Sequence, residues 1–102
     1  MHIRVLPEAD AELAEARVWY RHQRDGLDVE LIQRIDEALQ RISDAPRRFP
    51  YVYRRLRRAI VRQFPFAIFY ELTEDEIVVF AVFHSRRNPK RLTSRLNRQA
   101  KR

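Results

Sequence analysis

The stretch FAIFYELTEDEIVVFAVFH, residues 66–84, decides the fold of this 102-residue chain. It contains two runs of aromatic and β-branched residues, Phe66–Leu72 and Ile77–Phe83, joined by Thr73–Glu76. Such runs are typical of strands, and the four polar residues between them fit a hairpin loop. Because apolar residues occupy both faces of each run, we expect two inner strands of a sheet that is covered on both sides.

The residues before this hairpin predict a further strand. From Leu56 the pattern has a period of two, with Leu56, Ile60 and Phe64 on one side and mostly polar or small residues on the other. Pro65 lacks a backbone N–H, so we expect a bulge, a bend or a strand start there. The stretch 49–55 is basic and follows no regular pattern, and we interpret it as irregular.

The first half of the chain predicts one short strand and two helices. Residues 2–6 alternate apolar and polar, and Pro7 ends this strand and begins a helix. Gly26 stands where a glycine after the helix C-terminus is expected, and the second helix ends before Pro46. The connection is short, which favours an antiparallel helical hairpin. Apolar residues at helical spacing are Ala9, Leu13, Ala16 and Tyr20 in the first helix, and Leu27, Leu31, Ile35, Leu39 and Ile42 in the second.

The predicted fold class is therefore α+β, with a helical hairpin packed on a small antiparallel sheet in the order β-α-α-β-β-β. An optional C-terminal helix would place Leu92 and Leu96 on one side. A chain of this length is expected to form a single domain, residues 1–102, with a basic tail from about residue 89.

The composition excludes several classes of site. The chain has no Cys and one Gly, which excludes disulfides, Cys-ligated metals and glycine-rich phosphate loops. His2, His22 and His84 lie on separate elements without metal-ligand spacing, so we expect no metal and no cofactor. No apolar run approaches the roughly 20 residues of a membrane helix, and the N-terminus does not resemble a signal peptide. We therefore expect no membrane association and a cytoplasmic protein.

The formal charge of +7 is divided unevenly along the chain. Residues 1–46 carry 6 basic and 10 acidic side chains, a charge of −4, whereas residues 47–102 carry 15 and 4, a charge of +11. Arginine grips phosphates or carboxylates bidentately, so this half predicts a polyanionic partner, either nucleic acid or an acidic protein segment. The acid-free basic runs are Arg47, Arg48, Arg54, Arg55, Arg57, Arg58 and Arg62, and then Arg86, Arg87, Lys90, Arg91, Arg95, Arg98, Lys101 and Arg102.

His84 is the candidate for catalysis. RNA supplies its own nucleophile in the 2′-OH, so a protein that cleaves RNA needs only a base, an acid and nearby cations. His84 ends the last predicted strand beside Arg86 and Arg87, where a histidine could titrate near neutral pH. The alternative interpretation is a strand-end histidine in solvent with no role in catalysis.

Trp19 and Tyr20 also have two interpretations. Large aromatic residues at the end of an amphipathic helix are most often part of the core, and we expect this of both residues. The alternative is that an exposed part of Trp19 anchors a partner.

Taken in order, these segments resemble the RelE/ParE superfamily of type II toxin–antitoxin systems, on its ParE-like side. The resemblance covers about residues 3–92 and implies a helical hairpin on a small antiparallel sheet. It also implies a toxin that is neutralised by a cognate antitoxin with an acidic or amphipathic C-terminal segment. The segments that carry it are Pro7-Glu8-Ala9, Trp19-Tyr20, Ala38-Leu39 with Ile42 and Pro46, Phe49-Pro50, Leu56-Arg57-Arg58, residues 62–70, residues 79–84 and Arg86-Arg87-Asn88-Pro89.

The superfamily contains two activities, and the sequence differs from one of them. RelE-like members cleave mRNA on the ribosome, and ParE-like members inhibit DNA gyrase. RelE-like ribonucleases have an arginine directly after the aromatic residue that begins the third strand, whereas here Phe66 is followed by Ala67. Their C-terminal tyrosine is replaced around Leu92. The resemblance therefore favours a non-enzymatic gyrase inhibitor; the alternative is an endoribonuclease that uses His84, Arg86 and Arg87.

Contacts are assigned to the two partners on this basis. We expect a hetero-oligomer with the antitoxin, and no cofactor or metal. The expected target contacts, to gyrase or alternatively to the ribosome and mRNA, are Arg62, Arg86, Arg87 and Arg91, and the expected antitoxin contacts are Trp19, Arg57 and Arg58.

Overall fold

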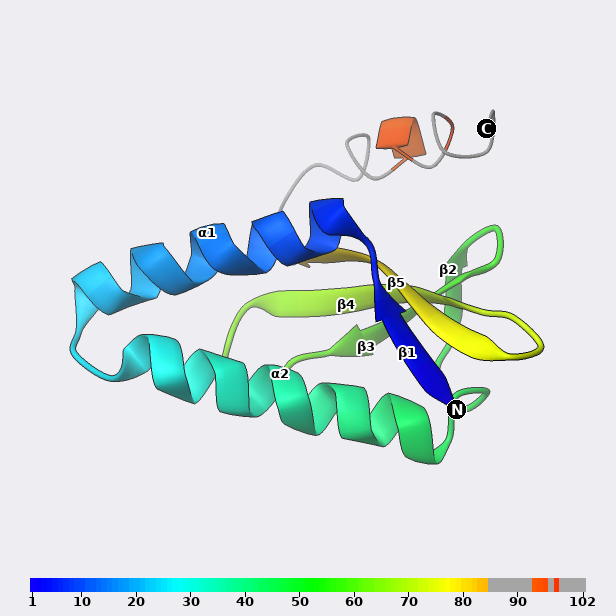
Figure 1. Ribbon diagram of the computed structural model, residues 1–102, viewed down its shortest axis with the longest axis horizontal. Helices are drawn as coiled ribbons and strands as arrows, with labels where there is room; N and C mark the ends of the chain where they lie inside the picture. Colours follow the sequence, from blue (N-terminus) through cyan, green and yellow to red (C-terminus); the bar gives the residue numbers. More distant parts are fainter. Residues whose placement is uncertain (85–92, 96, 98–102) are drawn as a thin grey trace.

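The protein is a five-stranded sheet with a helical hairpin packed on it (Figure 1). The computed structural model describes residues 1–84, 93–95 and 97. The order of strands across the sheet is β1-β5-β4-β3-β2. The elements are β1 His2–Val5, α1 Pro7–Gln23, α2 Leu27–Asp44, β2 Tyr51–Tyr53, β3 Leu56–Ile60, β4 Phe66–Leu72 and β5 Glu76–His84.

The sheet is mixed, which corrects the prediction of an antiparallel sheet. β1 pairs in parallel with β5, from His2 opposite Glu76 to Val5 opposite Val79, while the other three pairings are antiparallel. In the sequence, the two helices follow β1 and precede the other four strands. A connection this long allows β1 and β5 to run in the same direction. The apolar–polar alternation of β1 is the same for either direction, so it could not reveal the pairing.

β2 is a strand that the sequence did not predict, since the stretch 49–55 was interpreted as irregular. Tyr51 and Tyr53 pair with Arg57 and Leu56 of β3, and the register shifts between the two tyrosines. Arg54 turns the chain into β3 with a φ of 49°. A strand this short carries too little alternation to be distinguished from a loop.

The central hairpin of β4 and β5 confirms the prediction from residues 66–84. Both strands are inner strands, and both alternate faces are largely buried. The Thr73 N–H donates to the Glu76 carbonyl at 2.9 Å, which closes the turn. β5 therefore begins at Glu76, one residue earlier than predicted. Pro65 directly precedes β4, as expected of a strand start.

The helical hairpin is also confirmed, with one correction. α1 begins at Pro7 and α2 ends at Asp44, before Pro46. Gly26, however, is the N-cap residue of α2 with a φ of 85°, because α1 already ends at Gln23. The left-handed backbone at this position explains the only glycine of the chain.

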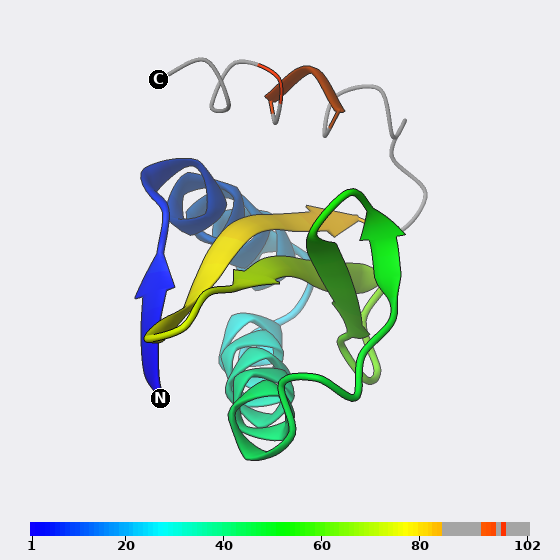
Figure 2. The same cartoon turned by 90° about the vertical axis from the view of Figure 1, so that its right-hand side faces the viewer.

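The main core lies between the helices and the sheet (Figure 2). The Tyr70 side chain is fully buried there, and its hydroxyl donates to the Pro46 carbonyl at 2.7 Å. Burial raises the pKa of Tyr70 to about 12. The predicted face of α2 is buried in this core through Leu31, Ile35, Ala38 and Ile42.

Residues 93–95 and 97 are helical, in agreement with the optional C-terminal helix. Leu92 and Leu96, which were expected on one side of that helix, lie outside the described residues. Within the described part of the chain, no helix combines the length and apolar character needed to cross a membrane.

Candidate functional site

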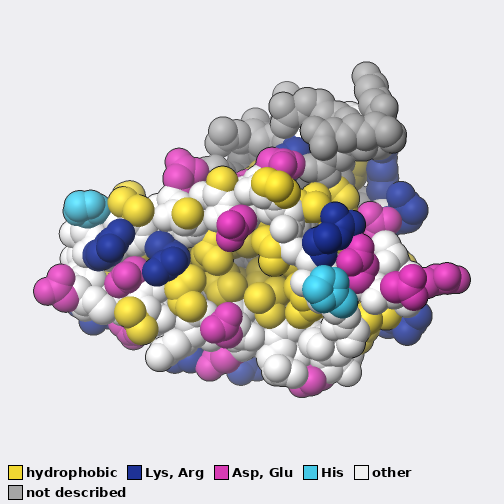
Figure 3. Space-filling view, in the orientation of Figure 1, with side chains coloured by type: hydrophobic (Ala, Val, Ile, Leu, Met, Phe, Trp, Pro, Cys, Tyr) yellow, Lys and Arg dark blue, Asp and Glu magenta, His cyan; other side chains and the backbone are white. Residues whose placement is uncertain are grey.

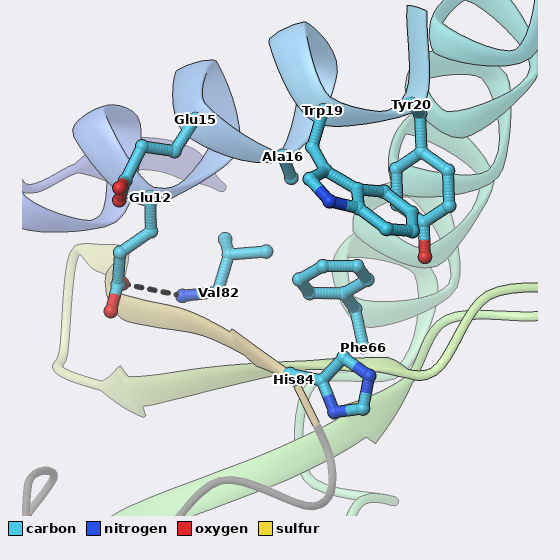
Figure 4. A pocket seen from close by; sticks show the side chains of 8 residues that line it. All are labelled: Glu12, Glu15, Ala16, Trp19, Tyr20, Phe66, Val82 and His84. Atoms are coloured by element: carbon cyan, nitrogen blue, oxygen red, sulfur yellow. Dashed lines mark hydrogen bonds between the residues drawn. The ribbon is translucent and has the colours of Figure 1, made fainter. Parts of the chain in front are cut away.

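A cavity of about 330 Å³ opens between α1 and the strands β4 and β5 (Figure 4). Two carboxylates, Glu12 and Glu15, lie at one end, and aromatic rings lie at the other (Figure 4). The residues that line it are Glu12, Glu15, Ala16, Trp19, Tyr20, Phe66, Val82 and His84. We name this site the Trp19 cavity.

Edge-to-face contacts hold the rings of the aromatic end. The Tyr20 ring centroid lies 4.8 Å from that of Trp19 and 6.1 Å from that of Phe66. Phe66 in turn contacts His84, with 5.5 Å between the ring centroids. Such contacts fix the orientation of each ring, so this end of the cavity is preorganised.

Trp19 corrects the prediction that both aromatic residues of α1 belong to the core. Tyr20 is half-buried against the core, but Trp19 is 57% exposed. Ala9 and Ala16 are the buried residues of α1 and mark its core face, and Trp19 lies to one side of that face. The alternative interpretation, an exposed aromatic residue available to a partner, fits this position.

The carboxylate end is tied into the fold through Glu12. Its Oε1 accepts a hydrogen bond from the Val82 N–H at 3.0 Å, and its Oε2 lies 3.1 Å from Arg95 Nη1. Arg95 also donates from Nη2 to the Phe80 carbonyl at 2.6 Å. β1 pairs with β5 only as far as Val79, so these two side chains satisfy backbone groups of β5 beyond β1.

The pair of Glu12 and Arg95 was missed by sequence reasoning. The two residues are 83 positions apart, and Arg95 stood in a run of basic residues that suggested only surface charge. Its side chain is 9% exposed in the structure. Neither spacing nor composition carries a signal for a contact of this kind.

His84 lines the Trp19 cavity from the end of β5, where it is half-buried. Arg86 and Arg87, its expected partners in a ribonuclease, lie outside the described residues, and so does Arg91. Among residues 1–84, 93–95 and 97, no three His, Asp or Glu side chains gather where they could hold a metal ion.

Arg57 and Arg58 differ although they are adjacent in β3. Arg57 Nη1 donates to the carbonyls of Arg47 and Phe49, at 3.0 and 2.7 Å, and Nη2 donates to the Tyr51 hydroxyl at 2.8 Å. Arg57 thus holds the segment that leads into β2. Arg58 is exposed, as is Arg62 beyond the end of β3.

The sequence matches, over residues 3–89, the family described as ParE toxin of type II toxin-antitoxin system, parDE. The chain belongs to this toxin family. Its fold is similar to a chain of the chromosomal ParDE TA system from P. aeruginosa, with a TM-score of 0.70 and 17% identity over 82% of this chain and 95% of that chain. No curated protein matches the sequence.

The toxin thus has the ParE-like character that its sequence segments implied. Ala67 of the toxin, which follows the first aromatic residue of β4, is 1% exposed and lies between Ile60 of β3 and Phe83 of β5. At the position where RelE-like ribonucleases would have a guanidinium group, the toxin therefore has a buried methyl group.

Hydrophobic side chains also gather on the helical hairpin of the toxin. Figure 3 shows them in a hollow between α1 and α2, with acidic and basic side chains around it. An exposed apolar surface with a charged border is typical of a protein–protein interface.

Proposed function

We propose that this ParE-family toxin inhibits DNA gyrase by binding, without catalysing a reaction, and that it acts in the cytoplasm. The observation that carries this proposal is the buried Ala67. Cleavage of RNA needs cations at the developing charge of the transition state, and β4 supplies none at this position. Arg62 and the basic residues beyond His84 would then contact the target.

The same proposal includes a cognate antitoxin that masks the helical hairpin and the Trp19 cavity. Trp19 is exposed while the neighbouring rings of Tyr20 and Phe66 are half-buried, which is the geometry of an aromatic anchor at an interface. An amphipathic segment would place apolar side chains at Trp19 and acidic side chains toward Arg58. The solved structure of similar fold is described as a ParDE TA system.

Purified toxin added to gyrase and plasmid DNA tests the proposed target. We expect loss of supercoiling and accumulation of gyrase–DNA cleavage complexes, both reversed by the antitoxin encoded beside the toxin gene. The Arg17→Gln variant, which removes an exposed charge from α1, serves as a matched control that inhibits like the wild type. Unchanged supercoiling together with unchanged cleavage complexes would contradict the proposal.

An endoribonuclease is the second candidate, and one observation favours it. His84 lines the same cavity as Glu12 and Glu15, so imidazole and carboxylates face a common space. Induction of such an enzyme would create new mRNA 5′ ends that disappear in the His84→Gln variant. Intact transcripts during growth arrest would remove this candidate.

A further inference from the structure

Three arginines converge where the end of α2 meets the end of β3. Arg41, in the last turn of α2, donates from Nη2 to the Ile60 carbonyl at 2.7 Å. Arg62 follows β3 and is exposed, and Arg48 is exposed in the segment after α2. We name these three residues the α2–β3 arginine patch.

The backbone that carries Arg62 is held in place by its neighbour. Gln63 has a φ of 73°, a strained conformation for a residue other than glycine. Its Oε1 accepts from Arg34 Nε at 2.9 Å, and its Nε2 donates to Glu30 Oε1 at 3.3 Å. Both partners belong to α2, so the helix fixes the segment beside Arg62 relative to Arg41.

The one carboxylate that favours the charged form of Arg41 has less effect than the neighbouring arginines. Burial lowers the pKa of Arg41, and the positive charges of Arg62 and Arg48 lower it further. Glu37 acts in the opposite direction but has the smallest effect, and its carboxylate is 2.6 Å from Arg34. The charges of Arg62 and Arg48 therefore each disfavour the charged form of the Arg41 guanidinium, and a bound anion beside Arg41 would offset this effect.

We propose that the α2–β3 arginine patch binds the phosphate groups of double-stranded DNA. The biological role of this contact rests on the proposed function, because it would hold the toxin on the DNA that gyrase cleaves. The exposed guanidinium groups of Arg48 and Arg62 can each bind a phosphate bidentately, while Arg41, whose Nη2 donates to the Ile60 carbonyl, adds positive charge beside them. Positive charge and polar contacts dominate protein–DNA interfaces.

The surroundings of the patch favour a phosphate backbone over a protein segment. A protein segment needs apolar pockets for its anchors, and the toxin has such a pocket at Trp19, on α1. Next to the patch, the Arg48 guanidinium lies 5.1 Å from the Phe49 ring centroid, and the Arg57 guanidinium lies 4.0 Å from that of Tyr51. These rings stack on the chain's own arginines rather than on bases. The contact is therefore to the DNA backbone and independent of base sequence.

Fluorescence anisotropy of a short labelled DNA duplex, titrated with the full-length toxin at several salt concentrations, tests this proposal without gyrase. Three phosphate contacts predict a slope of about −2.7 or steeper for log K against log salt, roughly a fortyfold loss between about 50 and about 200 mM. Arg48→Gln and Arg62→Gln should each reduce the slope by about 1. Arg17→Gln removes the same charge from α1 and should leave the slope nearer to that of the wild type.

Arg41 is replaced by lysine rather than by glutamine, because its side chain also donates a hydrogen bond to the Ile60 carbonyl. Arg41→Lys keeps the positive charge of the patch, so it should change the salt slope of duplex binding little. Thermal unfolding of each variant shows whether the fold is kept.

Equal effects of Arg17→Gln and the patch variants would overturn the proposal. So would patch variants that lose affinity for a polyglutamate peptide but bind the duplex like the wild type, because the patch would then serve an acidic protein. Gyrase inhibition without duplex binding would overturn this inference and leave the proposed function standing. Patch-dependent duplex binding without gyrase inhibition would overturn the proposed function and leave this inference standing.

Discussion

The Trp19 cavity and the α2–β3 arginine patch are built from opposite kinds of side chain. The cavity combines aromatic rings with two carboxylates on α1, β4 and β5. The patch gathers three guanidinium groups around the end of β3, where Arg62 and Arg48 act on Arg41 more strongly than Glu37 does. One small fold thus presents two chemically opposite surfaces, and we propose a different partner for each, a protein segment for the cavity and a phosphate backbone for the patch.

The two ends of the Trp19 cavity differ in how far their side chains are bonded within the fold. At the carboxylate end of the cavity, Glu12 and Arg95 are both largely buried and bonded to β5. At the aromatic end, Trp19 is mostly exposed. The cavity thus has one end that stabilises the fold and one end that remains available.

Glu12→Ala should have the largest effect on stability, because it leaves the Arg95 guanidinium buried without its carboxylate and the Val82 N–H without its acceptor. We expect a loss of about 3 kcal/mol in the free energy of unfolding, measured by urea titration. The double variant Glu12→Ala, Arg95→Met should recover part of this loss. Glu15→Ala, an exposed neighbour in the same cavity, should change stability by less than about 0.5 kcal/mol. A similar loss in both single variants would remove the distinction between the two ends.

Trp19→Ala should have the next largest effect, and on binding rather than on folding. We expect the antitoxin affinity to fall by about 2 kcal/mol, roughly thirtyfold, with duplex binding and gyrase inhibition unchanged. Isothermal titration calorimetry with the purified antitoxin measures the antitoxin affinity. The anisotropy assay measures duplex binding, and the supercoiling assay measures gyrase inhibition. If duplex binding fell together with antitoxin affinity, the two sites would not be independent.

Tyr70→Phe should have the smallest effect at neutral pH, a loss of about 1 kcal/mol, because only the hydrogen bond to the Pro46 carbonyl is removed. The pKa of Tyr70 is raised in the folded protein, so the extra stability is present below its ordinary pKa of about 10 and is lost as the pH rises toward about 12. The wild type should therefore lose stability more steeply than Tyr70→Phe over this range. Chemical unfolding at a series of alkaline pH values checks the difference, and parallel curves would contradict it.

Most of the fold could be predicted from the sequence because its elements have clear patterns. The apolar face of α2 and the double-sided runs of β4 and β5 are long enough to show their period. β2 could not be predicted, because three residues with a register shift have no period. The parallel direction of β1 is set by the helices that follow it and not by its own residues.

The candidate site was predicted less completely because its parts come together only in three dimensions. Trp19 and His84 were singled out separately, but nothing in the sequence shows that they line one cavity. Arg62 was expected at a target interface, whereas its association with Arg41 depends on how α2 crosses the end of β3. The sequence predicts an antitoxin contact for Arg57, whereas its guanidinium donates to the carbonyls of Arg47 and Phe49 in the same chain. The sequence cannot distinguish an exposed arginine from one that is hydrogen-bonded within the fold.

The contact between Glu12 and Arg95 also affects the order in which a newly made chain can form its contacts. A ribosome adds about 5–20 residues per second, so the 83 positions between the two residues correspond to roughly 4–17 s of synthesis. α1 and all five strands have been made before Arg95 is added to the chain. The pair of Glu12 and Arg95 can therefore form only after β5, the strand to which both side chains bond, has been synthesised.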